Sequence, residues 1–182
     1  MKKILFSIFY LLLIINQTFA DDRKDELNKL FRELKIKNPD ETFEIEQKIW
    51  KIWSTHPEKN DLTSLLAEGS NLVNQNKLYE AEAIFTKVIK LDPNWAEAWN
   101  KRATVLYMIG DFQESQKDIN KVLELEKRHF GALAGQGLVN IQLQNYEKAI
   151  KSYERAQKIY PSMESPKIMI EKINKLIKMQ LI

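Results

Sequence analysis

The sequence predicts an all-α protein built from stacked copies of one helix–turn–helix unit. The main observation is a self-similarity with a period of 34 residues, which aligns three copies without gaps: Leu62–Trp95, Ala96–His129 and Phe130–Met163. The eighth residue of each copy is small, and the seventeenth is bulky and apolar. A fixed period of this length indicates copies of one supersecondary unit, each unable to bury its apolar face alone.

The second copy carries the clearest motif: Ala96-Glu97-Ala98-Trp99, then Ala103, Gly110-Asp111-Phe112 and Leu125. This pattern and its period resemble the tetratricopeptide repeat family. The family's closing proline is present as Pro93 and Pro161, while the middle copy has Lys127 there. The resemblance covers residues 62–163. It implies a right-handed superhelical solenoid of three repeats (62–95, 96–129, 130–163) with a concave groove that holds a peptide or protein partner.

The first twenty residues have the features of a secretory signal peptide. Met1-Lys2-Lys3 is followed by an apolar run, Ile4–Ile15, and then by a polar segment that ends at Ala20. The run is shorter than the ~20 residues that span a bilayer as a helix. We therefore expect cleavage after Ala20 and export, to the bacterial periplasm. The alternative is an uncleaved signal segment, which would be the chain's membrane contact.

Residues 21–61 are expected to form an N-terminal helical cap. The pattern predicts helices over Asp21–Lys37 and Glu41–Ser54, separated by Asn38-Pro39-Asp40, where the proline ends one helix and the aspartate caps the next. This pair does not match the repeat positions. The sequence leaves open whether it covers the first repeat or fills the groove.

Each repeat is expected to contain two helices joined by a tight turn. The predicted helices are Leu62–Asn74, Tyr79–Lys90, Ala96–Met108, Phe112–Leu125, Phe130–Leu143 and Tyr146–Ile159. The turns carry residues that tolerate left-handed backbone, such as Asn76 and Gly110. Residues 164–182 are expected to form a C-terminal capping helix, Glu164–Gln180, with Ile170, Ile173, Leu176 and Ile177 on its apolar face.

The resemblance implies that the first helix of each pair lines the groove. The expected partner contacts are Asn100, Lys101, Thr104, Tyr107, Gly131, Gly135 and Leu138, and Glu97 lies on the same face by position. Asn100 and Thr104 are one turn apart, so both could hydrogen-bond to an extended backbone. Tyr107 offers apolar area with a polar tip.

Three glycines lie in one predicted helix of the third copy: Gly131, Gly135 and Gly137. A glycine inside a helix costs on the order of 1 kcal/mol relative to alanine. Gly137 stands where the two helices of a repeat must approach closely. The other two have two explanations: a smooth strip for a partner's backbone, or relief for the bulk of Trp95, His129 or Phe130.

The seventh residues of the copies are polar, namely Glu68, Arg102 and Gln136. Because stacked repeats place like positions side by side, we expect a polar ladder in which Arg102 lies near Glu68. Such a ladder is expected to be structural rather than a binding site.

Composition argues against several classes of function. The whole chain carries 28 basic and 25 acidic residues, and two of the basic ones are in the leader. Charges of both signs are mixed throughout, so the sequence lacks the basic stripe that nucleic-acid binding needs. There is no cysteine, and His56 and His129 are the two histidines, both in connecting segments. We therefore expect no enzyme, no metal site and no cofactor.

The expected function is an exported protein–protein interaction adaptor that presents a concave groove to a peptide or helix of an envelope partner. The alternative is an envelope protein that binds glycan through Trp50 and Trp53, or a membrane surface through the lysine-bearing last helix. The sequence indicates no oligomeric state.

Overall fold

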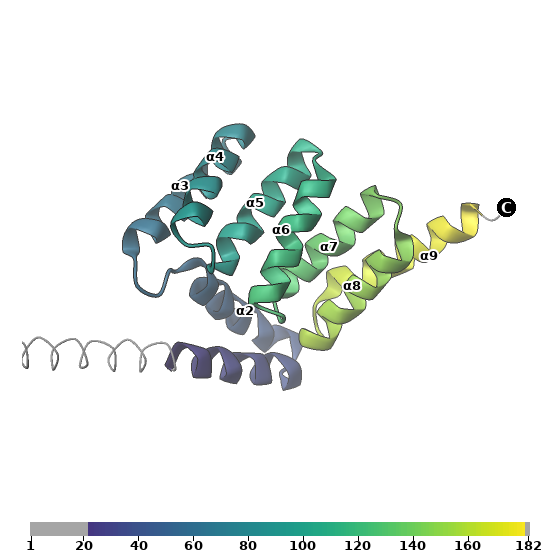
Figure 1. The fold of residues 1–182 in the computed structure, drawn as a ribbon. Coiled ribbons are helices and arrows are strands. Elements are labelled where there is room, and N and C mark those ends of the chain that lie inside the picture. The colour runs from purple at the N-terminus through teal and green to yellow at the C-terminus, as the bar shows by residue number, and fades with distance from the viewer. Residues whose placement is uncertain (1–21, 181–182) are drawn as a thin grey trace, which may run out of the picture. The chain divides into compact units, whose positions relative to one another are not determined.

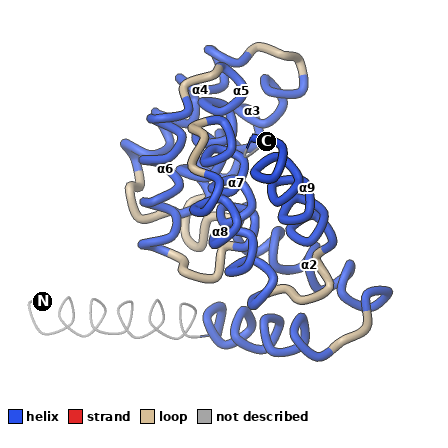
Figure 2. The backbone as a smooth tube through the Cα atoms, turned by 90° about the vertical axis from the view of Figure 1, so that its right-hand side faces the viewer, coloured by secondary structure: helices blue, strands red, loops and turns tan. Residues whose placement is uncertain are grey.

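The structure is a computed structural model that describes residues 22–180. The predicted signal peptide, residues 1–20, lies outside the described residues, as do positions 181 and 182. The chain divides into two compact units, Met1–Ile52 and Trp53–Ile182. Throughout the described part every regular element is a helix (Figure 2).

The described part of the first unit consists of a helix over residues 22–36 and most of α2 (Pro39–Ser54). The predicted break is confirmed, because Pro39 begins α2 at the position where its missing N–H costs no hydrogen bond. The expectation that Asp40 caps this helix was wrong, since Asp40 lies within its first turn. The guanidinium of Arg23 donates to the carbonyl of Ile52. The buried apolar side chains of this unit are Leu27, Leu30, Phe31, Leu34, Ile45 and Ile49.

The second unit contains the three repeats and a last helix (Figure 1). Its helices are α3 (Asn60–Asn74), α4 (Leu78–Leu91), α5 (Ala96–Ile109), α6 (Phe112–Leu125), α7 (Phe130–Gln142), α8 (Tyr146–Ile159) and α9 (Glu164–Gln180). Within each repeat the two helices pack against each other, and each second helix packs against the next element along the chain. The predicted repeat helices are confirmed to within two residues at either end.

The turns inside the three repeats share one backbone feature. Asn76 and Gln144 have φ angles of 59°, and Gly110 has 98°. These residues are 34 apart, so the same position of each copy is left-handed. In each repeat this conformation lets the chain reverse direction between the first helix and the second.

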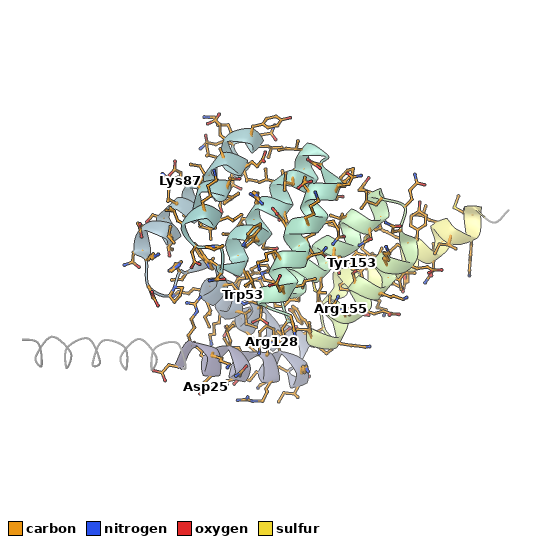
Figure 3. The ribbon with its side chains drawn as sticks, in the orientation of Figure 1. Asp25, Trp53, Lys87, Arg128, Tyr153 and Arg155 are labelled. Carbon is orange, nitrogen blue, oxygen red and sulfur yellow. The ribbon has the colours of Figure 1, made fainter. Side chains whose placement is uncertain are left out.

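Small residues at the eighth position allow the two helices of a repeat to approach. A Cβ atom at Gly137 would lie within 2.8 Å of three ring carbons of Tyr153, and one at Gly69 would overlap the ring of Phe85. Both rings are buried, and Figure 3 marks Tyr153 on α8. The expected packing role of Gly137 is therefore confirmed.

The last helix, α9, packs against α8. Ile173 is fully buried beside Ala149 and Tyr153, with Ile170 and Ile177 at the edge of that cluster. The expected apolar face was wrong at Leu176, which is 43% exposed because it lies on the flank of this stripe. None of the described helices is long and apolar enough to cross a bilayer.

Candidate functional site

A pocket of about 70 Å³ opens between the first helices of the second and third repeats, with α6 behind them. It is lined by Asn100, Ala103, Thr104 and Tyr107 from α5, Ser115 and Ile119 from α6, and Gly131, Ala132, Gly135, Leu138 and Val139 from α7. Six of the seven predicted contacts line it, and the seventh, Lys101, does not. Their role in binding stays a prediction.

Gly135 has room for a side chain. The nearest atom that a Cβ at this position would meet is Cδ1 of Ile119, at 3.8 Å, which is an ordinary van der Waals distance. Trp95, His129 and Phe130 are not within reach, so relief of their bulk does not explain this glycine. Because Gly135 has no side chain, the space beside it remains open and forms part of the pocket.

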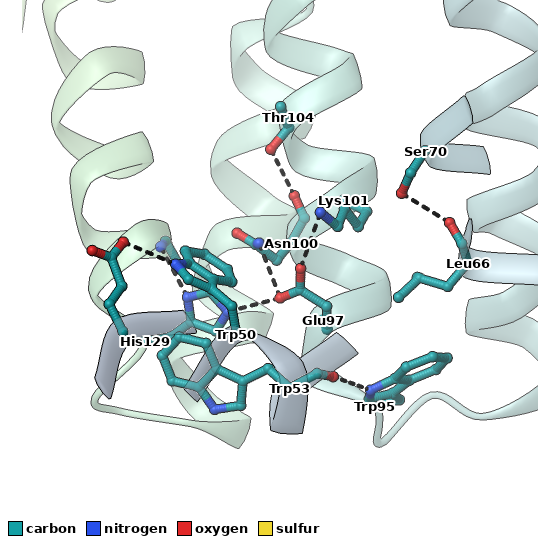
Figure 4. Close-up of polar contacts among 12 residues, drawn as sticks. Trp50, Trp53, Leu66, Ser70, Trp95, Glu97, Asn100, Lys101, Thr104 and His129 are labelled. Carbon is teal, nitrogen blue, oxygen red and sulfur yellow. Dashed lines mark hydrogen bonds and ion pairs between the residues drawn. The ribbon is translucent and has the colours of Figure 1, made fainter. Parts of the chain in front are cut away.

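Three polar side chains of α5 follow one another along the pocket (Figure 4 shows the first two). The amide nitrogen of Asn100 donates to Oε2 of Glu97 at 3.1 Å. The hydroxyl of Thr104 donates to the carbonyl of Asn100 at 3.0 Å. The hydroxyl of Tyr107 accepts a hydrogen bond from Nε2 of Gln142 on α7, at 3.3 Å.

A buried ionisable pair lies beneath these groups. Nε2 of His129 is 3.0 Å from Oε2 of Glu97, and both side chains are fully buried. Nδ1 of His129 accepts from the backbone N–H of Ala132 and so caps α7. Because Nδ1 accepts, the proton of the neutral ring is on Nε2, which donates to the carboxylate. Glu97 shares its face of α5 with Asn100 and Lys101, and its carboxylate is fully buried and bonded to His129.

Lys101 lies beside the pocket rather than in its wall. Its ammonium group is 3.4 Å from Oε1 of Glu97, one helical turn away. Oε2 of Glu97 thus receives both His129 and Asn100, while Oε1 is buried and, among the described residues, has only the ion pair with Lys101.

Trp53 has a packing role in the second unit. Its ring stacks on His129 with centroids 4.0 Å apart and planes 9° apart, and it contacts Phe130 at 5.1 Å. Its carbonyl accepts from Nε1 of Trp95 at 2.8 Å (Figure 4). One face of this indole is thus covered by protein, which removes it from the surface that glycan binding would need. Trp53 therefore does not support the alternative in which Trp50 and Trp53 bind a glycan.

The polar ladder differs from the one expected. Arg102 donates twice to Asp118 on α6, at 2.7 and 2.8 Å, and once to Thr86 on α4, at 3.1 Å. The prediction that it lies near Glu68 was wrong, because its side chain is long enough to reach the second helices instead. The hydrogen bond to Asp118 is the main cause that raises the pKa of Arg102 above its ordinary value.

Gln136 makes the equivalent connection one repeat later. Its amide donates to Asn120 at 3.3 Å and accepts from the hydroxyl of Ser152 at 3.0 Å. In both repeats the partners lie sixteen residues before and after the polar residue. The seventh position therefore joins the second helices of adjacent repeats, which is the structural role expected of it.

Sequence reasoning also missed the role of the two histidines. His56 accepts from the backbone N–H of Lys59, just before α3, and its Nε2 lies 2.8 Å from Asp92. His129 caps α7, whereas His56 accepts from the N–H groups of Glu58 and Lys59 in the turn before α3, which has no side-chain cap. The position of each histidine shortly before a first helix was the available signal. Among the described residues no group of three His, Cys, Asp or Glu side chains could hold a metal ion.

Comparisons with known proteins agree with this architecture. The tetratricopeptide repeat family model matches residues 66–115 and 101–164. A TPR repeat-containing protein of Rhizobium etli is 31% identical over 140 residues, which are 76% of this chain and 68% of that protein. Hsp70-Hsp90 organizing protein 1 of Glycine max is 30% identical over 112 residues, 59% of this chain. The match covers only 20% of that longer relative.

Solved structures share the fold. The first TPR of Spaghetti (RPAP3), bound to an HSP90 peptide, has a TM-score of 0.64 and 24% identity, covering 66% of this chain and 96% of that chain. The Yersinia enterocolitica type III secretion chaperone SycD, in complex with a peptide of the translocator YopD, has a TM-score of 0.62 and 15% identity. It covers 66% of this chain and 97% of that chain.

Proposed function

Because the chain belongs to the tetratricopeptide repeat family, we propose that it is a protein–protein interaction adaptor that binds a peptide segment of a partner at the pocket between α5 and α7. The observation that carries the proposal is the pocket, which combines an apolar wall with polar groups, most of them on α5. Such a combination is typical of sites that fix both the position and the orientation of a ligand.

Size and rigidity support a peptide ligand. A cavity of about 150 Å³ holds a benzene-sized molecule, so the pocket of about 70 Å³ fits a small aliphatic side chain. Two of its three wall helices, α6 and α7, begin with side-chain caps from Asp111 and His129, and a preformed helical wall reduces the entropy lost on binding. Two solved structures with this fold hold peptides of their partners.

The proposal assigns no chemical reaction to the chain. It also includes export to the cell envelope, where the partner would be found. Export rests on the leader, with Lys2 and Lys3 before an apolar run that ends at Ala20. Fractionation of a bacterium that expresses the full chain, followed by intact-mass measurement, tests it. We expect a species in the envelope fraction that begins at Asp21. A full-length mass in the cytoplasmic fraction contradicts export.

Photo-crosslinking tests the binding role. A photoreactive residue at position 104 lies in the pocket wall, while position 70 is the matching place in the first copy. We expect a discrete protein adduct from position 104 and much less from position 70 in the same cells. Equal labelling at the two positions, or sedimentation of the pure protein with cell wall or lipid vesicles alone, contradicts the proposal.

A further inference from the structure

We propose that the pocket selects an uncharged, extended peptide segment, which donates its backbone N–H groups to Asn100 and Thr104 and inserts a small apolar side chain beside Gly135. This inference rests on the proposed peptide binding and adds the chemistry of the ligand. It follows from the hydrogen bonds that the protein's own groups have already made.

The orientation of Asn100 is fixed by the carboxylate of Glu97. A carboxylate in this setting only accepts, so the amide nitrogen of Asn100 must face it, as the 3.1 Å contact shows. The amide oxygen then points away from Glu97, as Figure 4 shows. No described residue donates to that oxygen, so Asn100 presents an acceptor.

Thr104 also presents an acceptor. Its single hydroxyl hydrogen is used in the bond to the carbonyl of Asn100, and its oxygen lone pairs remain. Four residues of helix rise about 6 Å, and two residues of an extended chain span about 6.6 Å. Alternate N–H groups of an extended peptide therefore match the spacing of Asn100 and Thr104.

The next side chain along α5 has the opposite polarity. Because the hydroxyl oxygen of Tyr107 accepts from Gln142, its own hydrogen is available to a carbonyl oxygen. Two acceptors followed by a donor suit the edge of a peptide backbone, which offers both N–H and C=O groups.

The electrostatics disfavour an acidic ligand. None of the described residues that line the pocket is charged, and Lys101 beside it is paired with the buried carboxylate of Glu97. A carboxylate that entered the pocket would meet the acceptors of Asn100 and Thr104 and would lose hydration without a cationic partner. An aliphatic side chain would instead contact Ile119, Leu138 and Val139.

The test is an array of random octapeptides, blocked at both ends, probed with the full chain. We expect the bound peptides to be enriched in Ala, Val and Thr and depleted in Asp and Glu. N-methylation of single backbone nitrogens in the best binder should weaken binding about tenfold at two positions that are two residues apart. Enrichment of acidic peptides would overturn this inference and leave the proposed adaptor function standing.

Two variants separate the pocket from the rest of the surface. Thr104→Val removes the acceptor with little change in shape and should weaken the best binder about fivefold, as expected for one hydrogen bond. Ser70→Ala is the matched control, because Ser70 donates to the carbonyl of Leu66 in the same way one repeat earlier. Equal effects of the two variants overturn the inference, and an array with no bound peptide overturns the adaptor function itself.

Discussion

The two interfaces between successive first helices have the same register and different contents. Where Asn100 lines the pocket between α5 and α7, the matching residue between α3 and α5 is Leu66, which is buried in the core. Where the third copy has Gly131 and Gly135, the second has Glu97 and Lys101. The interface between α5 and α7 thus lacks the two long side chains of Glu97 and Lys101 and has the amide of Asn100 in place of a leucine.

This difference indicates that different residues determine the repeat fold and the pocket. The residues that recur every 34 positions determine helices, turns and close approach, and they are interchangeable between copies. The residues that differ between copies determine whether the space between two first helices is filled or open. Specificity is therefore expected at the departures from the repeat.

Removing Arg102 should have the largest effect of the changes considered, because it joins the first two copies. Arg102→Met leaves the carboxylate of Asp118, which is 4% exposed, without its ionic partner. We expect a loss of about 3 kcal/mol in the free energy of unfolding, measured by urea denaturation.

Gln136→Met is the matched change between the second and third copies. It breaks only neutral hydrogen bonds, to Asn120 and Ser152, and should cost about 1 kcal/mol. If the two variants lose the same stability, the charge of the Arg102 pair has no special role.

Gly137→Ala should lower stability by about 2 kcal/mol, since the new methyl group would overlap the ring of Tyr153 and force the helices apart. Urea denaturation followed by circular dichroism measures the change. An unchanged midpoint would mean that the ring moves freely, and the close approach of α7 and α8 would need another explanation.

Gly135→Ala, two residues earlier, should have the opposite effect on stability. A methyl group fits at 3.8 Å from Ile119, so the helix gains about 0.7 kcal/mol from the better helix former. The same methyl reduces a pocket of about 70 Å³, and binding of the best array peptide should weaken about fivefold. A more stable variant that binds equally well would separate Gly135 from the site.

Much of the fold could be predicted because its signals are local. Pro39 and the turn residues mark where helices begin and end, and the period identifies which positions are small. Six pocket residues could be placed by their position on two helices. The orientation of the Asn100 amide could not, because it depends on the carboxylate of Glu97, whose partner His129 lies 32 residues away.

The error at Arg102 has a related cause. The period places like positions near one another, which suggested Glu68 as its partner. The side chain instead extends to the second helices, where Asp118 and Thr86 lie sixteen residues away on either side. A repeat period gives the positions of Cα atoms, and it does not give the reach of a long side chain.

The smallest expected change is at the turn of the third copy. Gln144 has the left-handed backbone that Gly110 adopts at the same place in the second copy, and a residue with a Cβ atom is strained there. Gln144→Gly should therefore raise the free energy of unfolding by about 0.5 kcal/mol, because relief of that strain exceeds the entropy that glycine adds to the unfolded chain. Gly110→Ala should lower the free energy of unfolding by about 1 kcal/mol, because the new Cβ atom introduces the same left-handed strain at position 110. Urea denaturation of both variants gives the comparison, and a stability loss in Gln144→Gly would show that the side chain of Gln144 contributes more than its backbone costs. Neither change touches the pocket, so peptide binding should be unaltered in both.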